Sequence, residues 1–83
     1  MPQIKVSCII PTFNESARVA GVLEAVVGHQ LVSEVIVIND GSKDNTEEIL
    51  RTRPGIKLIS YQPNRGKSHA IMMGIKAAKN DLS

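Results

Sequence analysis

Several features that would identify common kinds of protein are absent from this chain of 83 residues. It has no Trp and a single cysteine, Cys8, so neither a disulfide framework nor a zinc site can form within one chain. Its 10 Lys and Arg are interspersed with 8 Asp and Glu, which argues against a nucleic-acid partner. No apolar run approaches the roughly 20 residues that span a bilayer, and the N-terminus lacks a signal-peptide pattern. We therefore expect a soluble, cytoplasmic chain without a membrane span.

Common motifs of nucleotide and metal sites are also missing. No G-x-G-x-x-G follows the first apolar run, where a dinucleotide-binding fold needs it. A Walker loop requires a glycine at position 61, but Tyr61 precedes the segment Asn64-Arg65-Gly66-Lys67-Ser68. There is no D-x-D, and no His or Cys pair has metal-ligand spacing. The segment from Asn64 to Ser68 at a helix start still favours an anion or a base edge, and a basic solvated turn is its alternative.

Three apolar segments alternate with three segments of helical pattern. The strands are predicted over Ile4 to Ile10, Val35 to Ile38 and Ile56 to Tyr61, with Pro11 and Pro63 as stops. Because Val35 to Ile38 shows no polar alternation, this strand should be covered on both faces. Strand–helix alternation predicts an α/β fold of order βαβαβα, with a parallel sheet and right-handed crossovers. The end, from Lys79 to Ser83, resembles the first residues of a fourth strand, so we expect one partial domain, residues 1–83, of a larger protein.

The helices are predicted from caps and apolar stripes. Asn14 or Ser16 should cap the first helix and Gly28 should end it, with a sheet-facing stripe of Val19, Val22, Leu23 and Val26. Asp44 and Glu47 resemble a capping box for the second helix, which should end at Pro54-Gly55. The third helix should run from about Gly66 to Ala78, with one packed side formed by Ile71, Met72, Ile75 and Ala78.

Asp40 is the leading candidate for a functional residue. It follows the apolar residues Val35 to Ile38 closely and precedes Gly41, so it should lie at the carboxyl end of a strand, where open α/β sheets bind ligands. A carboxylate there can accept hydrogen bonds from a base or from ribose hydroxyls. Its alternative role is bonding the amides of its own turn. His29 is expected at the surface, and His69 lies in the first turn of the third helix.

Three ordered segments carry a family resemblance over nearly the whole chain. They are Ile9-Ile10-Pro11-Thr12-Phe13-Asn14-Glu15, Val37-Ile38-Asn39-Asp40-Gly41-Ser42-Lys43-Asp44-Asn45-Thr46 and Asn64-Arg65-Gly66-Lys67-Ser68-His69-Ala70. The chain resembles the opening of family 2 glycosyltransferases, which include dolichol- and polyprenyl-phosphate sugar synthases and polysaccharide synthases. The resemblance implies the Rossmann-like half of a GT-A fold and transfer of a sugar from a UDP- or GDP-sugar to a lipid-phosphate or saccharide acceptor.

The resemblance also implies a set of nucleotide-binding residues. Pro11 to Glu15 and Asp40 would line the base and ribose, and Arg65 to Lys67 would close over the base and the diphosphate. The full set is Pro11, Thr12, Phe13, Asn14, Glu15, Asp40, Gly41, Arg65, Gly66 and Lys67. The family's D-x-D and catalytic base come later in the chain. We therefore expect no catalytic residue, metal ligand or cofactor in this chain, and Mg or Mn in a full-length enzyme at the cytoplasmic face of a membrane.

The competing interpretation is a non-catalytic nucleotide-binding or self-assembling α/β module. In the GT-A fold the fourth strand lies beside the first, so a chain ending at Ser83 should expose the edge from Ile4 to Ile10. Unpaired N–H and C=O groups of such an edge pair readily with another chain. We therefore expect a homo-oligomer that forms through the first strand.

Overall fold

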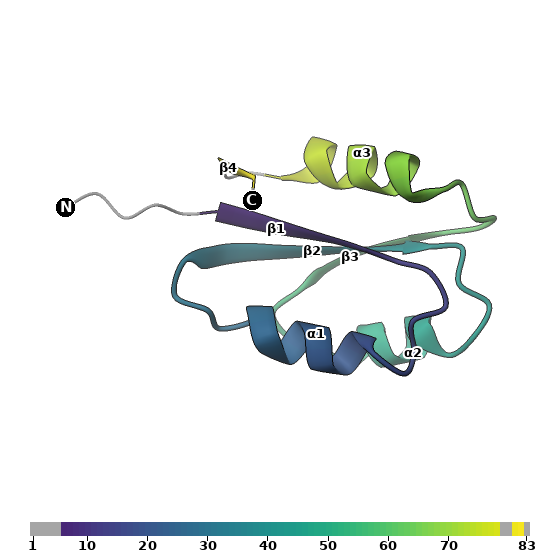
Figure 1. Cartoon of the computed structure of the whole chain (residues 1–83), viewed down its shortest axis with the longest axis horizontal. Helices are drawn as coiled ribbons and strands as arrows, with labels where there is room; N and C mark the ends of the chain where they lie inside the picture. Colours follow the sequence, from purple (N-terminus) through teal and green to yellow (C-terminus); the bar gives the residue numbers. More distant parts are fainter. Residues whose placement is uncertain (1–5, 79–80, 83) are drawn as a thin grey trace.

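A parallel four-stranded sheet lies between two layers of helices in the computed structural model, which describes residues 6–78 and 81–82 (Figure 1). The strand order is β3-β2-β1-β4, and α3 covers one face while α1 and α2 cover the other. The elements are β1 (Val6–Thr12), α1 (Val19–Val26), β2 (Val32–Asp40), α2 (Thr46–Arg51), β3 (Lys57–Tyr61), α3 (Lys67–Ala77) and β4 (Asp81–Leu82). The predicted α/β fold with a parallel sheet is confirmed.

Strand β2 forms the centre of the core, and its side chains alternate between the two faces. Val35 and Val37 belong to the cluster under α1 and α2, together with the buried residues Val19, Leu23 and Leu50. Ile36 and Ile38 face α3 and pack on Ala70. All four β2 side chains are buried, as expected for a strand covered on both faces.

Helix α3 packs mainly through small residues, and the predicted packed side was wrong except for Ala78, which lies against the core. Ile71, Met72 and Ile75 are exposed, whereas the sheet side is formed by Ala70, Met73, Gly74 and Ala77. Small residues on that side bring the helix close to the sheet: a Cβ placed on Gly74 would lie 2.5 Å from Ile9 Cγ2. The apolar stripe of this helix therefore marks its outer face.

The predicted N-cap of α1 was also wrong, whereas the predicted stop is confirmed, since the helix ends at Val26 and Gly28 follows its C-cap with φ 88°. Arg18 occupies the N-cap without a side-chain cap, and the Glu15 carbonyl accepts hydrogen bonds from the Arg18 and Val19 amides. Asn14 adopts a left-handed backbone, with φ 51°, and binds a neighbouring loop instead. Of the predicted stripe, Val22 is 43% exposed.

The start of α2 is only partly as expected. Asp44 accepts hydrogen bonds from the amide and the hydroxyl of Thr46, the first residue of the helix. Glu47 does not close a capping box; it accepts a bond from Ser60 Oγ at 2.7 Å and pairs with Arg51 at 2.6 Å. Helix α2 is thereby joined to β3 by a side-chain contact.

The free edge of β1 is shorter than predicted. Asp81 and Leu82 pair with Val6 and Ser7, so β4 covers the beginning of β1. Residues 4 and 5 of the predicted edge, and 79, 80 and 83 of the predicted fourth strand, lie outside the described residues. Pro11 does not end β1, which continues to Thr12 with Pro11 opposite Ile38 of β2. A proline is tolerated here because no described strand pairs with the other side of β1 at this level.

None of the helices within residues 6–78 and 81–82 combines the length and the hydropathy that crossing a bilayer requires.

Two glycines inside helices should respond oppositely to alanine. Gly74→Ala adds a methyl group against Ile9 and Ile38, and overpacking typically costs about 1–3 kcal/mol. Gly21→Ala in α1 meets no atom within 4 Å and should raise the free energy of unfolding by roughly 0.5–1 kcal/mol through helix propensity. Urea denaturation of both variants checks this. A stabilised Gly74→Ala would show that α3 does not lie this close to the sheet.

Candidate functional site

A cavity of about 580 Å³ opens at the carboxyl ends of β1 and β2, next to the start of α3. Its volume is in the range of small-molecule sites. It lies where open α/β sheets bind ligands, beyond the ends of neighbouring parallel strands. The lining residues come from these three elements and the loops next to them: Pro11, Thr12, Phe13, Glu15, Asp40, Asn64, Gly66 and Lys67.

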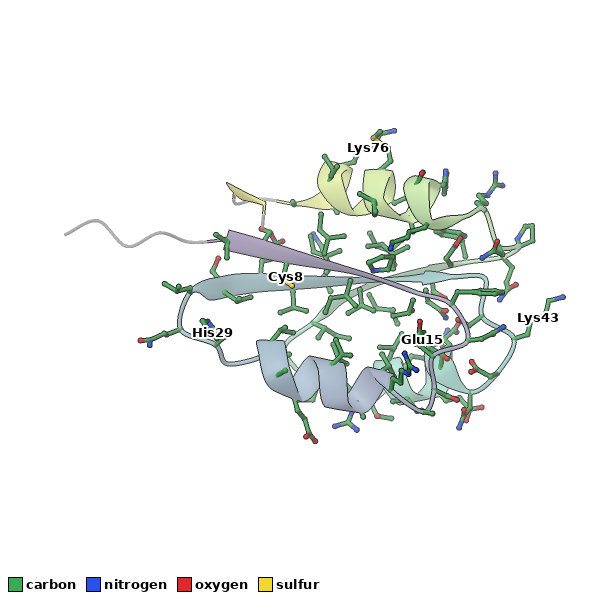
Figure 2. The ribbon with its side chains drawn as sticks, in the orientation of Figure 1. Cys8, Glu15, His29, Lys43 and Lys76 are labelled. Carbon is green, nitrogen blue, oxygen red and sulfur yellow. The ribbon has the colours of Figure 1, made fainter. Side chains whose placement is uncertain are left out.

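The loop after β1 is fastened to the loop after β2. The Asn14 amide donates to Ser42 Oγ at 2.9 Å, and Asn14 Oδ1 accepts from the Lys43 amide at 2.8 Å. One residue later, the Glu15 amide donates to Thr46 Oγ1 at 3.1 Å. Figure 2 shows Glu15 and Lys43 near this end of the sheet, while His29 lies at the opposite end. These reciprocal bonds fix one wall of the cavity.

Asp40 fastens the loop after β3 to the end of β2. Its Oδ1 accepts from the Arg65 amide at 2.8 Å, and its Oδ2 accepts from the Gly66 amide at 3.0 Å and from Asn64 Nδ2 at 2.9 Å. Asn64 Nδ2 also donates to the Asp40 carbonyl at 2.9 Å. Asp40 is only 3% exposed. Its carboxylate therefore bonds amides of a distant loop rather than those of its own turn.

The surroundings of Asp40 favour its charged form. Burial by itself would raise the pKa of the carboxyl, but the Arg65 amide, the nearby Tyr61 hydroxyl, the Gly66 amide and the charge of His69 together hold the pKa below its ordinary value. In turn, burial and the Asp40 carboxylate raise the pKa of Tyr61 to about 12. The buried Tyr61 hydroxyl makes no hydrogen bond of good geometry with any described residue. Its ring meets that of His69 edge-on at 5.4 Å.

Gly41 allows the two loops to touch. It has φ 72°, and a Cβ there would lie 2.2 Å from the backbone nitrogen of Asn64. Any other residue would push the loop after β3 away from β2. Gln62 adds a further link, because its Nε2 donates to the Ser42 carbonyl at 2.9 Å.

Seven of the ten predicted site residues line the cavity, namely Pro11, Thr12, Phe13, Glu15, Asp40, Gly66 and Lys67. The other three lie next to it with different contacts: Asn14 binds the Lys43 loop, Gly41 lies under Asn64, and Arg65 bonds Asp40 through its amide. Sequence reasoning omitted Asn64 from the site. Its position directly before Arg65 and Gly66 could have indicated its role, because Asn side chains often form hydrogen bonds with nearby backbone groups.

Other parts of the described chain are weaker candidates for a functional site. No cluster of three His, Cys, Asp or Glu among residues 6–78 and 81–82 could hold a metal ion. A smaller cavity of about 290 Å³ lies beside α1 and is lined by Leu23, Glu24, Val27, Arg53 and Pro54. It lies away from the strand ends that hold Asp40, and only Glu24 and Arg53 supply polar side chains. The larger cavity is the candidate site.

Asp40→Asn should destabilise the chain and flatten its response to acid. A carboxyl whose pKa is lowered by folding stabilises the chain above its unfolded pKa of about 3.9, and this stability is lost as the pH falls through the folded pKa. Losing hydrogen bonds to a charged acceptor costs roughly 1.5–3 kcal/mol at neutral pH. Urea denaturation between pH 2 and 7 measures both effects.

Glu48→Gln removes the same charge from an exposed position in α2 and serves as the control. It should keep the stability of the parent near neutral pH. Equal stabilities and equal acid responses of Asp40→Asn and Glu48→Gln would contradict the role of Asp40.

Comparisons with known proteins agree with this architecture. Residues 7–82 match the sequence profile of Glycosyl transferase family 2. A dolichyl-phosphate beta-glucosyltransferase of Trichomonas vaginalis is 31% identical over 96% of this chain and 28% of its own length. A poly-beta-1,6-N-acetyl-D-glucosamine synthase of Staphylococcus epidermidis is 38% identical over 88% of this chain and 19% of its own length.

Among solved structures, the chain is similar to a mannosyltransferase from Pyrobaculum calidifontis in complex with GDP-Man and Mn2+. The TM-score is 0.82 at 26% identity, over 95% of this chain and 26% of the other. The chain thus spans between about a fifth and three tenths of the length of these relatives. With the profile match covering nearly all of its residues, the chain belongs to glycosyl transferase family 2.

Proposed function

We propose that this chain is the donor-binding part of a glycosyltransferase that transfers a sugar from a UDP- or GDP-sugar. The observation that carries the proposal is the cavity at the carboxyl ends of β1 and β2, which combines an exposed aromatic ring, a buried carboxylate and a helix start with a lysine. These are groups that suit a base, a ribose and a diphosphate respectively. The solved mannosyltransferase holds GDP-Man, which supports a nucleotide sugar as the ligand.

The base and ribose would lie against Pro11 to Glu15 and Asp40. Phe13 is 46% exposed at the cavity and offers an apolar ring for a base to pack on. A carboxylate accepts about four hydrogen bonds, and the described contacts of Asp40 use three, two on Oδ2 and one on Oδ1. The Tyr61 hydroxyl also lies near this carboxylate, so an N–H of the base or a ribose hydroxyl would take the fourth acceptor position in place of Tyr61.

The diphosphate would lie at the start of α3. Helix N-termini attract anions because their first amides lack partners within the helix and carry partial positive charge. Lys67 is the first residue of α3 and lines the cavity, and Arg65 stands exposed on the adjoining loop. Gly41 contributes by its small size, which lets this loop reach the site.

The acceptor is proposed only as a class, a lipid phosphate or a saccharide. The similar dolichyl-phosphate glucosyltransferase and the poly-N-acetylglucosamine synthase differ in the acceptors that their names imply. Both proteins match nearly all of this chain, which is one segment of their own length. We infer that the segment carries what these proteins have in common, the handling of the nucleotide sugar.

We also propose that a full-length enzyme uses a divalent metal, Mg or Mn. The described residues lack a suitable cluster of ligands, and the solved neighbour is a complex with Mn2+. Such a cation would neutralise the charge that develops on the leaving diphosphate. The described residues of this chain would bind and orient the nucleotide.

Isothermal titration calorimetry with UDP and GDP tests the proposed site. The parent should bind at least one of them, and Lys67→Ala should weaken binding about tenfold, since losing a bond to a charged group costs roughly 1.5–3 kcal/mol. Lys57→Ala, which removes an exposed lysine at the start of β3, should bind like the parent. A parent that binds neither nucleotide at millimolar concentration contradicts the proposal.

We further propose that the chain forms a homo-oligomer through the edge of β1. Support comes from the two-residue length of β4, which pairs with Val6 and Ser7 and leaves residues 8–12 without a described strand on that side. Multi-angle light scattering from 10 to 500 micromolar, roughly the range in which weak edge pairing would appear, should show a dimer or larger species. A monomer throughout this range rejects the interface.

A further inference from the structure

The loop after β3 has one side chain that bonds both the backbone and the carboxylate of Asp40. Asn64 Nδ2 donates to the Asp40 carbonyl oxygen and to Oδ2, each at 2.9 Å. The next two residues of the loop, Arg65 and Gly66, donate their amides to the same carboxylate. Asn64 therefore holds Asp40 through its carbonyl and its carboxylate, and the two amides that follow bind the same carboxylate.

This arrangement also determines where α3 begins. Gly66 is the N-cap of α3, with φ 96°, and no side chain of its own turn caps the helix in the described chain. From the end of β2, Asp40 accepts the amide of this N-cap residue. Since Lys67 is the next residue, the contacts of Asp40 with the loop place this lysine at the cavity.

We propose that Asn64 is a positioning residue of the nucleotide site, which fixes the Asp40 carboxylate and the loop carrying Arg65 and Lys67 in a single arrangement. The inference rests on the proposed function, because it assigns Asn64 a part in nucleotide binding. Asn64 suits this task chemically. A side-chain amide presents N–H donors toward Asp40 and brings no charge, so Asp40 keeps its own charge for the loop amides and the ligand.

Substituting Asn64 by aspartate makes this contact dependent on pH. Asn64→Asp keeps the shape of the side chain but places a second carboxylate against Asp40, at the position where Nδ2 now lies 2.9 Å from Oδ2. Two carboxylates this close cannot both ionise readily, and such a pair retains a shared proton to a higher pH than a single carboxyl. With that proton the pair keeps one O–H donor, and without it the two charges repel.

The test compares UDP and GDP affinities of the parent, Asn64→Ala, Asn64→Asp and Asn45→Asp between pH 4.5 and 8. Each affinity is divided by that of the parent at the same pH, which cancels the titration of the nucleotide itself. Asn45 is exposed before α2 and makes no side-chain cap bond, so Asn45→Asp controls for the added charge. Amide hydrogen exchange of Arg65 and Gly66, measured by NMR without nucleotide, follows the loop independently of binding.

Asn64→Ala should bind about tenfold more weakly than the parent at every pH, the loss expected for one bond to a charged group. Asn64→Asp should show a similar loss at pH 8 and recover most of the affinity by pH 5. Relative to the parent at the same pH, exchange of Arg65 and Gly66 should be faster at pH 8 and close to the parent's at pH 5. Asn45→Asp should match the parent throughout. The recovery at low pH also shows that Asn64→Asp folds.

The proposal is overturned if Asn64→Ala binds like the parent, or if the relative affinity of Asn64→Asp does not change with pH. These outcomes differ from a failure of the proposed function, in which the parent itself binds neither UDP nor GDP. In that case Asn64 has no nucleotide to position, and the proposal falls together with the proposed function. The exchange of Arg65 and Gly66 would then still report whether the loop contact exists.

Discussion

The buried carboxylate of Asp40 is the constraint on which the arrangement of the site depends. A charge that is almost fully removed from water must be compensated by hydrogen bonds, and three donors from the loop after β3 supply them. The loop can satisfy this need only by lying directly on Gly41, which has no side chain in the way. One electrostatic requirement thereby determines the course of the loop and the first residue of α3.

The segment after β2 also binds the loop that follows β1, the neighbouring strand on its other side. Ser42 and Thr46 accept the amides of Asn14 and Glu15, so the loop after β1 is tied to the same segment as the loop after β3. This convergence follows from the strand order, in which β2 lies between β1 and β3. Parallel strands place all their carboxyl ends at one edge of the sheet, and the middle strand is the one that both neighbouring loops can reach.

The fold and much of the site could be predicted because they depend on local patterns. The uninterrupted apolar run at Val35 to Ile38 indicates a strand with two covered faces, and an Asp-Gly directly beyond it marks the rim of the sheet. The packed face of α3 could not be found in this way. Helical spacing finds an apolar stripe at Ile71 and Ile75, but close packing against Ile9 selects the small residues Ala70 and Gly74 instead.

The partners of Asp40 were hidden from sequence reasoning for a different reason. They lie more than twenty residues away, and the bonds are made by backbone amides whose direction depends on the loop conformation. The predicted N-cap of α1 failed similarly, because the side-chain oxygen of Asn14 accepts the Lys43 amide in the loop after β2 instead of capping the helix locally. Local sequence patterns therefore predicted the helices and strands well, but they predicted contacts between loops poorly because those contacts depend on distant partners.

The charges at the cavity limit what this part of the chain can contribute to binding a diphosphate. Glu15 and Asp40 bring two carboxylates to the lining, and Lys67 brings one ammonium group. The amides of Arg65 and Gly66 already donate to Asp40, so they are not available to an anion at the start of α3. The lining is therefore not a strongly positive site. Hydrogen bonds of the buried Asp40 carboxylate fix the loop that carries Lys67, so the proposed contribution of this site is to orient the nucleotide rather than to neutralise its charge.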